Sequence, residues 1–501
     1  MSTIKILGKN IRFLVLNRFV GMVLLFILFP FIVTHVGKEN YGVYLIVTTF
    51  TGYFGLLDFG VMSALTKFVS EYHGADDKKS IYRIINASFT FYVIIGIAIA
   101  GLLFTCFPYF FIFFKINPTT IPVAKQLFTI AAISALFVWP LSTFRGIIQG
   151  LNLWNLDATV NMIAQLLNAI TTFVLLSLGH GIVSIFIAMQ ISLILANIVY
   201  LYLAKKNISF KLVFPFLEFK TFKFIFNFSF FMFLSSLLSL FIYQIHNLII
   251  GYFISVSAIT LYAVAYNFQN YFRIINSTIG ASPWISASGM EGRRDYDRQQ
   301  ELVFKGTKYM TAAILPLIIV TFFFTEPFIC YWIGPGFKDS VMPTKIIILF
   351  WLFNSTLESA SGMLSAKGIV KAPLFIQLAV ALLNIILGIS LIKVLGITAM
   401  AVGLTISAVF VGFPLTLWLS LKTLNIPLKD YFNKAIKSNI YIYLFAGLLS
   451  FLALKTFYPP NLSWTLFEMA LIYSILIGSY YFVVLDKSEK TQIIKLIGIG
   501  A

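Results

Sequence analysis

Residues 13–36 read FLVLNRFVGMVLLFILFPFIVTHV, an apolar run that contains a single arginine. A helix of this length covers the roughly 30 Å of hydrocarbon in a bilayer, so the run predicts a membrane-spanning helix. Similar runs recur along the whole chain. The fourteen predicted spans are 13–36, 42–65, 84–107, 126–149, 158–178, 182–204, 224–250, 255–285, 309–333, 344–366, 373–395, 397–421, 437–457 and 464–485.

The composition independently indicates a membrane protein. The chain is 59% hydrophobic and 11% charged, with a mean hydropathy of +0.93, which is too apolar for a soluble core. A net charge of +18 could indicate nucleic-acid binding, but the charges are scattered through short loops without a nucleic-acid-binding motif. We therefore expect contacts with anionic membrane lipids and no nucleic-acid partner.

Basic residues are concentrated on one side of the predicted spans. The two termini, the loops that follow even-numbered spans and the span ends next to them hold 28 of the 36 lysines and arginines. The remaining loops and span ends hold seven, and Arg273 lies deeper inside a span. Because basic loops remain in the cytoplasm, this bias predicts a multi-pass protein with both termini cytoplasmic.

An internal repeat suggests how the spans are organised. Residues Tyr44–Phe54 (YLIVTTFTGYF) and Tyr262–Phe272 (YAVAYNFQNYF) match at an offset that also aligns the loops after them, although aromatic-rich helices can match by chance. Parallel repeats are common in transporters, which bind substrate between the two halves. We predict an N-terminal lobe at 1–205, a C-terminal lobe at 206–422, and two added spans with a cytoplasmic tail at 423–501.

Four charged residues lie inside predicted spans at a similar depth. Arg273 lies roughly 26 Å from the outer surface by helical rise, and Asp58, Glu358 and Arg18 fall near the same level. Charged groups are costly in a bilayer and usually face a cavity or a partner. A guanidinium matches phosphate oxygens, so Arg273 is the candidate to bind an anion such as a phosphate or diphosphate. Asp58 and Glu358 would balance these charges or bind a coupling ion; a purely structural set of ion pairs is the alternative.

Two further residues are weaker candidates. His246 could titrate near neutral pH or serve as a structural histidine. Arg145 could bind substrate, but a salt bridge with Asp157 that orders the short loop between them is the alternative. We find no catalytic cluster, no metal-ligand spacing, no phosphate-binding glycine loop and no cofactor site. We therefore expect a protein that is not an enzyme and that draws on an ion gradient, with H⁺ or Na⁺ left open, on the membrane potential or on the gradient of its substrate.

Four stretches resemble a known family. Residues 17–46 (NRFVGMVLLFILFPFIVTHVGKENYGVYLI), 52–72 (GYFGLLDFGVMSALTKFVSEY), 145–168 (RGIIQGLNLWNLDATVNMIAQLLN) and 247–268 (NLIIGYFISVSAITLYAVAYNF) are similar to segments of bacterial polysaccharide flippases. These are the O-antigen and capsule repeat-unit translocases of the multidrug/oligosaccharidyl-lipid/polysaccharide exporter superfamily. The likeness extends over the whole chain.

The resemblance implies a MATE-like fold with two six-helix lobes and two C-terminal helices. It also implies an undecaprenyl-diphosphate-linked oligosaccharide as substrate, the bacterial inner membrane as location, and polysaccharide polymerase machinery as a candidate partner. Family arginines on spans 1 and 8 correspond to Arg18 and Arg273. At His246 many relatives have an aspartate, so the resemblance assigns no ion-coupling role there. The rival functions are a cation-coupled multidrug exporter of the same fold and a membrane-embedded glycan enzyme.

Overall fold

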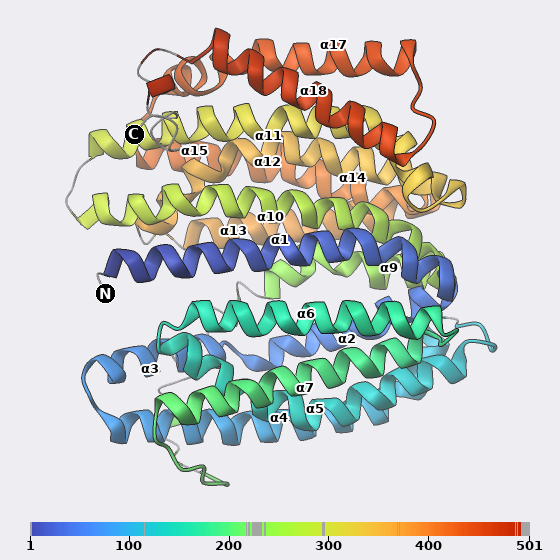
Figure 1. Cartoon of the computed structure of the whole chain (residues 1–501), viewed down its shortest axis with the longest axis vertical. Coiled ribbons are helices and arrows are strands. Elements are labelled where there is room, and N and C mark those ends of the chain that lie inside the picture. The colour runs from blue at the N-terminus through green and yellow to red at the C-terminus, as the bar shows by residue number, and fades with distance from the viewer. Residues whose placement is uncertain are drawn as a thin grey trace. The chain divides into compact units, whose positions relative to one another are not determined.

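The structure, a computed structural model, describes most of the chain. It covers residues 3–114, 116–216, 218, 221–222, 233–234, 237–292, 296–367, 369, 371–485, 487 and 489–491, without the side chains of 3–11, 106, 111, 279–292, 365 and 366. Over these residues all regular structure is helical, with α-, 3₁₀- and π-helical segments (Figure 1). The predicted all-α membrane architecture is confirmed.

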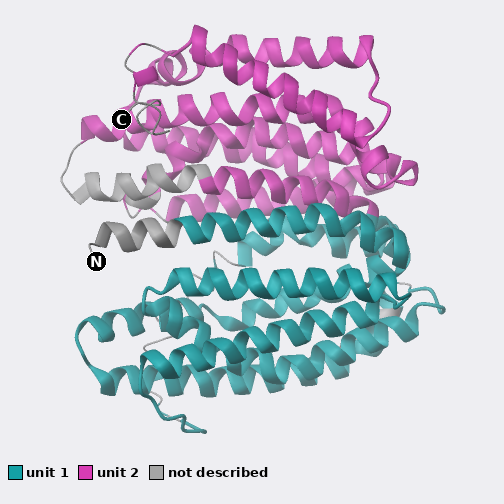
Figure 2. Ribbon diagram, viewed as in Figure 1, with its two compact units in different colours: residues 1–260 teal, residues 261–501 magenta. Residues whose placement is uncertain are grey.

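Contacts divide the chain into two compact units, residues 1–260 and 261–501 (Figure 2). The first unit holds α1 (Thr3–Val36), α2 (Lys38–Phe54), η1 (Gly55–Asp58), α3 (Val61–Gly74), α4 (Lys78–Phe113), α5 (Ile121–Gly150), α6 (Trp154–Ser177), α7 (Ile182–Asn207), α9 (Ile245–Phe253) and the start of α10 (Val256–Gly292). The two units are defined by contacts and do not test the lobes that the internal repeat predicts, so the lobes stay a prediction.

Helices of the first unit pack through small residues. On α5, a Cβ at Gly146 would lie 2.7 Å from Leu65 Cδ2, and one at Gly150 would lie 2.9 Å from the Thr66 carbonyl oxygen. Helix α3 therefore lies directly against the backbone of α5, as small residues permit in membrane helix pairs. The buried core on either side of this contact is formed by α3, α4, α5 and α7.

The second predicted span is broken. We expected one helix over 42–65, but α2 and α3 are separate helices bent by 46° around η1. Phe59 and Gly60 between them have φ of 46° and 77°, in the left-handed region that ends a right-handed helix. The expectation of one continuous helix is therefore wrong, because hydropathy does not detect a local change of backbone hand.

Loop residues define where the helices of the first unit restart. Asp77 precedes α4, and its Oδ1 accepts a hydrogen bond from the Ser80 N–H at 3.0 Å. Hydrogen bonds from Ser80, through its side chain first and its backbone N–H second, lower the pKa of the Asp77 carboxyl, because they favour the charged form. An aspartate at this position satisfies one of the unpaired amide groups at the helix start.

The second unit is built around the long helix α11, which packs against α12, α17 and α18. Its elements after α10 are α11 (Tyr296–Trp332), η2 (Pro335–Ser340), α12 (Val341–Ala366), α13 (Lys371–Leu395), α14 (Thr398–Ser407), the π-helical η3 (Ala408–Gly412), α15 (Phe413–Thr423), α16 (Leu428–Tyr431), the π-helical η4 (Phe432–Ile436), η5 (Lys437–Asn439), α17 (Ile440–Thr456) and α18 (Leu462–Val483).

The predicted count of fourteen spans is not confirmed. Among the described residues, 11 helices are long and apolar enough to cross a membrane, or 12 when the bent α2–α3 pair is counted as one span. Of the other two predicted spans, 224–250 lies partly outside the described residues, and 255–285 corresponds to α10 except for its first residue. Helix α10 is long enough, but many of its residues are polar.

Candidate functional site

Helix α10 carries an unusual number of polar side chains for a membrane helix. Asn267, Gln269 and Asn276 are buried, whereas Arg273 is exposed and donates from Nη2 to Asn270 Oδ1 at 2.9 Å. A polar side chain in a membrane protein normally faces other helices or a water-filled cavity. Arg273 is thus the predicted site residue of the second unit that carries a positive charge, and its side chain is exposed.

Glu358 lies on α12 in the polar stretch NSTLESASG and is partly buried. Among the residues that the structure describes, no side chain or backbone group donates to its carboxylate. An ionised carboxylate is costly in such surroundings without a cation or a donor. The side chain is therefore suited to bind a proton or a cation.

Asp58 lies at the break in span 2. Its Oδ1 accepts hydrogen bonds from the Met62 N–H at 3.2 Å and from the Tyr92 hydroxyl of α4. The carboxylate thus stabilises the first turn of α3 and connects the break to α4. These contacts give Asp58 a structural role in addition to the charge-balancing role predicted from the sequence.

Arg18 is exposed on α1. Its neighbour Asn17 accepts a hydrogen bond from Gln165 Nε2 of α6 at 3.0 Å, and Gly21 lies against the same glutamine. Helix α1 therefore packs against α6 next to Arg18 and leaves the arginine exposed.

Arg18 and Asp58 belong to the first unit, and Arg273 and Glu358 belong to the second. The predicted gathering of all four charges at one level therefore spans both units and stays a prediction.

The suggested ion pair between Arg145 and Asp157 is present. Arg145 donates from Nε and Nη2 to the two carboxylate oxygens at 2.8 and 3.2 Å. Gln149, Asn161 and Tyr200 donate to the same carboxylate at 3.1, 3.1 and 2.7 Å. Asp157 is buried, and its charge is satisfied from three helices. Gln149 and Asn161 are not among the residues predicted from the sequence, although each lies one helical turn from a member of the pair.

His246 is buried on α9, at a junction between α2, α9 and the start of α10. Next to it, Asn247 Nδ2 donates to Thr49 Oγ1 at 2.8 Å, and Thr260 Oγ1 donates to the Lys38 carbonyl at 2.6 Å. The sequence does not predict this junction, because its partners lie about two hundred residues apart in the chain.

Gly42 allows the junction to form. A Cβ added at Gly42 would lie 2.2 Å from the Val256 carbonyl oxygen, so α2 touches the backbone of α10 there. A larger residue would separate the two helices.

The described residues contain no group of histidine, cysteine, aspartate and glutamate side chains that could hold a metal ion.

A single family model covers more than half of the chain: the model described as polysaccharide biosynthesis protein matches residues 7–288. The chain belongs to this family. The model described as MatE matches residues 231–390. No curated protein sequence matches the chain.

Solved structures share the fold of this family member. A lipid II flippase MurJ in an inward closed conformation aligns with a TM-score of 0.69 at 18% identity, over 93% of this chain and 97% of that one. An inward-facing multidrug resistance MATE family transporter aligns with a TM-score of 0.68 at 15% identity, over 82% and 95%.

A transporter of the MOP superfamily from Pyrococcus furiosus aligns with a TM-score of 0.59 at 16% identity, over 85% of this chain and 99% of that one. At these identities the likeness shows the fold alone, and it confirms the predicted MATE-like architecture. The family match confirms the resemblance to polysaccharide flippases. The matches to the two family models support a transporter rather than an enzyme.

Proposed function

We propose that this protein is a flippase that moves an undecaprenyl-diphosphate-linked oligosaccharide from the inner to the outer leaflet of the bacterial cytoplasmic membrane. Both termini would be cytoplasmic, and the product would serve the assembly of a surface polysaccharide such as O antigen or capsule. Polysaccharide polymerase machinery is the class of partner that would use the flipped product.

The exposed guanidinium of Arg273 on the polar helix α10 carries this proposal. A diphosphate brings negative charge into the membrane, and arginine binds phosphate oxygens through paired hydrogen bonds. Asn270 accepts one N–H of Arg273 at 2.9 Å and holds the side chain along the helix. The exposed guanidinium would bind the phosphate oxygens of the substrate.

The other charged residues take supporting roles in this proposal. Arg18 is the second candidate for the diphosphate, because it too is exposed on a membrane helix. Glu358 is the candidate to accept a proton or a coupling cation, because no group donates to its carboxylate among the described residues. Asp58 would balance positive charge only when its bonds to Tyr92 and Met62 are released.

A cation-coupled multidrug exporter is the second candidate function. The MatE match at 231–390 favours it, and so does the acidic side chain of Glu358 on α12. An exporter of cationic drugs needs acidic groups to dominate its binding site, whereas the exposed charge on α10 is positive.

Substitution of Arg273 tests the proposal. The experiment uses cells whose surface polysaccharide depends on this protein, with surface polysaccharide and lipid-linked oligosaccharide as readouts. We expect Arg273→Ala to reduce flipping about 10- to 100-fold, because hydrogen bonds to a charged group contribute about 1.5–3 kcal/mol. Arg273→Lys should restore part of the activity, since an ammonium keeps the charge but loses the paired geometry.

Arg12→Ala is the matched control, because Arg12 is also an exposed arginine, near the start of α1. It should leave polysaccharide unchanged, and all variants should be present in the membrane at equal amounts. Normal polysaccharide in Arg273→Ala cells would refute the role of Arg273. Efflux of a cationic dye that depends on the protein, without accumulation of lipid-linked oligosaccharide on its deletion, would favour the exporter.

A further inference from the structure

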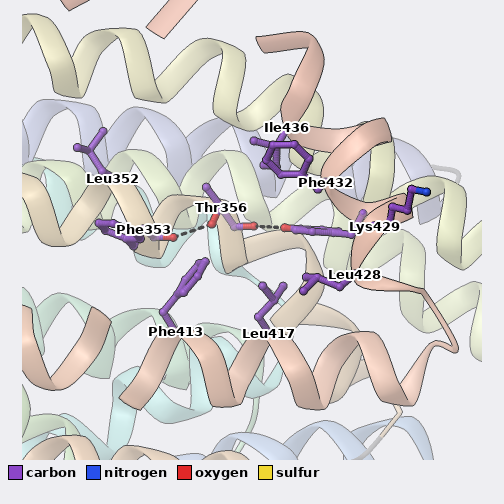
Figure 3. A pocket seen from close by; sticks show the side chains of 10 residues that line it. Leu352, Phe353, Thr356, Phe413, Leu417, Leu428, Lys429, Phe432 and Ile436 are labelled. Atoms are coloured by element: carbon purple, nitrogen blue, oxygen red, sulfur yellow. Dashed lines mark hydrogen bonds between the residues drawn. The ribbon is translucent and has the colours of Figure 1, made fainter. Parts of the chain in front are cut away.

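The second unit contains a groove that the proposed transport does not use. It has a volume of about 640 Å³ and lies between α12, α15 and the α16–η4 segment that precedes α17 (Figure 3). This volume is in the range of ligand-binding pockets, roughly 300–1,000 Å³. In the predicted topology the groove extends from the middle of α12 to the cytoplasmic end of α15 and the α16–η4 segment.

The walls of the groove present apolar side chains. Phe413 and Leu417 of α15 face Leu428 and Phe432 across it (Figure 3). Leu428 and Phe432 are 63% and 45% exposed, although large apolar side chains are stabilised by burial. The groove therefore suits an apolar chain.

The polar atoms of the wall bond to one another. Thr356 Oγ1 donates to the Phe353 carbonyl at 2.7 Å, and the Tyr431 hydroxyl donates to the Thr356 carbonyl at 2.8 Å (Figure 3). A saccharide needs hydrogen-bonding partners, and these groups are already bonded within the wall. With both hydroxyl hydrogens already donated, the wall disfavours the sugar part of the proposed substrate and favours a hydrocarbon chain.

One end of the groove is positively charged. Lys429 is exposed there, with its ammonium directed away from the apolar side chains (Figure 3). Among the described residues it makes no ion pair. Residues 422–437 carry four lysines and one acidic residue, Asp430. Basic pockets between membrane helices on the cytoplasmic side bind anionic lipid headgroups.

Both walls contain a π-helical turn. Residues 408–412 lead into Phe413, and 432–436 begin with Phe432. Such turns are rare and are frequently found at functional sites, because the wider turn redirects neighbouring side chains. Here each π-helical turn adjoins a phenylalanine that lines the groove.

We propose that the groove binds an anionic phospholipid of the inner leaflet, with one acyl chain between α15 and α16 and the phosphate beside Lys429. The apolar walls and the single cationic end match the two parts of such a lipid. A phospholipid remains in its own leaflet, so this site is separate from the path of the flipped substrate.

Lipid binding to the purified full-length protein tests the proposal. The probes are phosphatidylglycerol and phosphatidylcholine with identical acyl chains, and the readouts are native mass spectrometry and the melting temperature in detergent. We expect phosphatidylglycerol to be retained more strongly and to raise the melting temperature, because a ligand that binds only the folded state stabilises it. Lys429→Gln should weaken the binding of phosphatidylglycerol about fivefold, because one lysine near an anionic lipid surface contributes about 1 kcal/mol.

Lys371→Gln is the matched control, since Lys371 is an exposed lysine at the start of α13 and does not line the groove. It should bind phosphatidylglycerol like the unaltered protein. Leu417→Trp should fill the groove and weaken the binding of both lipids. Equal retention of the two lipids, or no effect of Lys429→Gln, would overturn the proposal. Displacement of phosphatidylglycerol by polyprenyl diphosphate, with flipping lost in Lys429→Gln, would assign the groove to the substrate instead.

Discussion

At the scale of single residues, Asp157 shows how this protein keeps a buried charge. Four side chains donate to its carboxylate, and Arg145 supplies the opposite charge while remaining 41% exposed. A buried carboxylate that loses its cation is strongly destabilising, because the desolvation cost remains. The contacts of Arg145 therefore favour the structural role over substrate binding.

We expect Arg145→Gln to lower the stability by about 1–3 kcal/mol, as for a buried group left without its partner. Adding Asp157→Asn should recover part of this loss, because the double variant no longer buries a charge. Melting temperatures in detergent measure both effects. If Arg145 is structural, the double variant recovers surface polysaccharide together with stability; recovered stability without flipping would instead assign Arg145 to the substrate.

At the scale of helices, the junction of α2, α9 and α10 depends on one glycine. Its hydrogen bonds join residues 38–49 to residues 247–260, which belong to different predicted lobes. In the predicted topology this junction lies toward the outer side of the membrane. Release of a substrate to the outer leaflet would then require it to open.

Gly42→Ala should open the junction, because the new methyl group would overlap the Val256 carbonyl at 2.2 Å. In a background without native cysteines, Thr49→Cys and Asn247→Cys should be joined by a short bifunctional thiol reagent. We expect Gly42→Ala to reduce this crosslinking and also flipping. Gly52→Ala is the control on the same helix, since its methyl group would meet only the end of the Gln244 side chain at 3.1 Å. Undiminished crosslinking in Gly42→Ala would contradict this account.

Hydropathy predicted the positions of most helices because each span must bury its own backbone polar groups in lipid. It could not predict the break after Asp58, since a phenylalanine at positive φ is uncommon. Hydropathy also predicted α10 as an ordinary span despite its many polar side chains, although the sequence identified Arg273 there. The α2–α9–α10 junction and the groove beside α15 depend on tertiary contacts that a single sequence does not show.

At the scale of the whole molecule, the distribution of basic residues predicts one orientation. The termini, the loops predicted to be cytoplasmic and the adjoining span ends hold 28 of the 36 basic residues, so reversal would place most of the positive charge outside. Fourteen spans and twelve spans both place the two termini on the same side.

Reporter fusions test this orientation. Green fluorescent protein fused after Ala501 should fluoresce, because it folds in the cytoplasm, and alkaline phosphatase fused at the same place should be inactive. Alkaline phosphatase inserted between Phe457 and Asn461, in the loop before α18, should be active. The opposite pattern at either site would reject the predicted topology.

The bend in span 2 separates two helices with different neighbours. Helix α3 lies against the backbone of α5 at Gly146 and Gly150, whereas α2 is joined to α9 and α10 through Gly42 and Thr49. The two halves of one span can consequently differ in their local opening. Amide hydrogens of α3 should exchange slowly with deuterium in every state, while those of α2 should exchange faster whenever the junction opens.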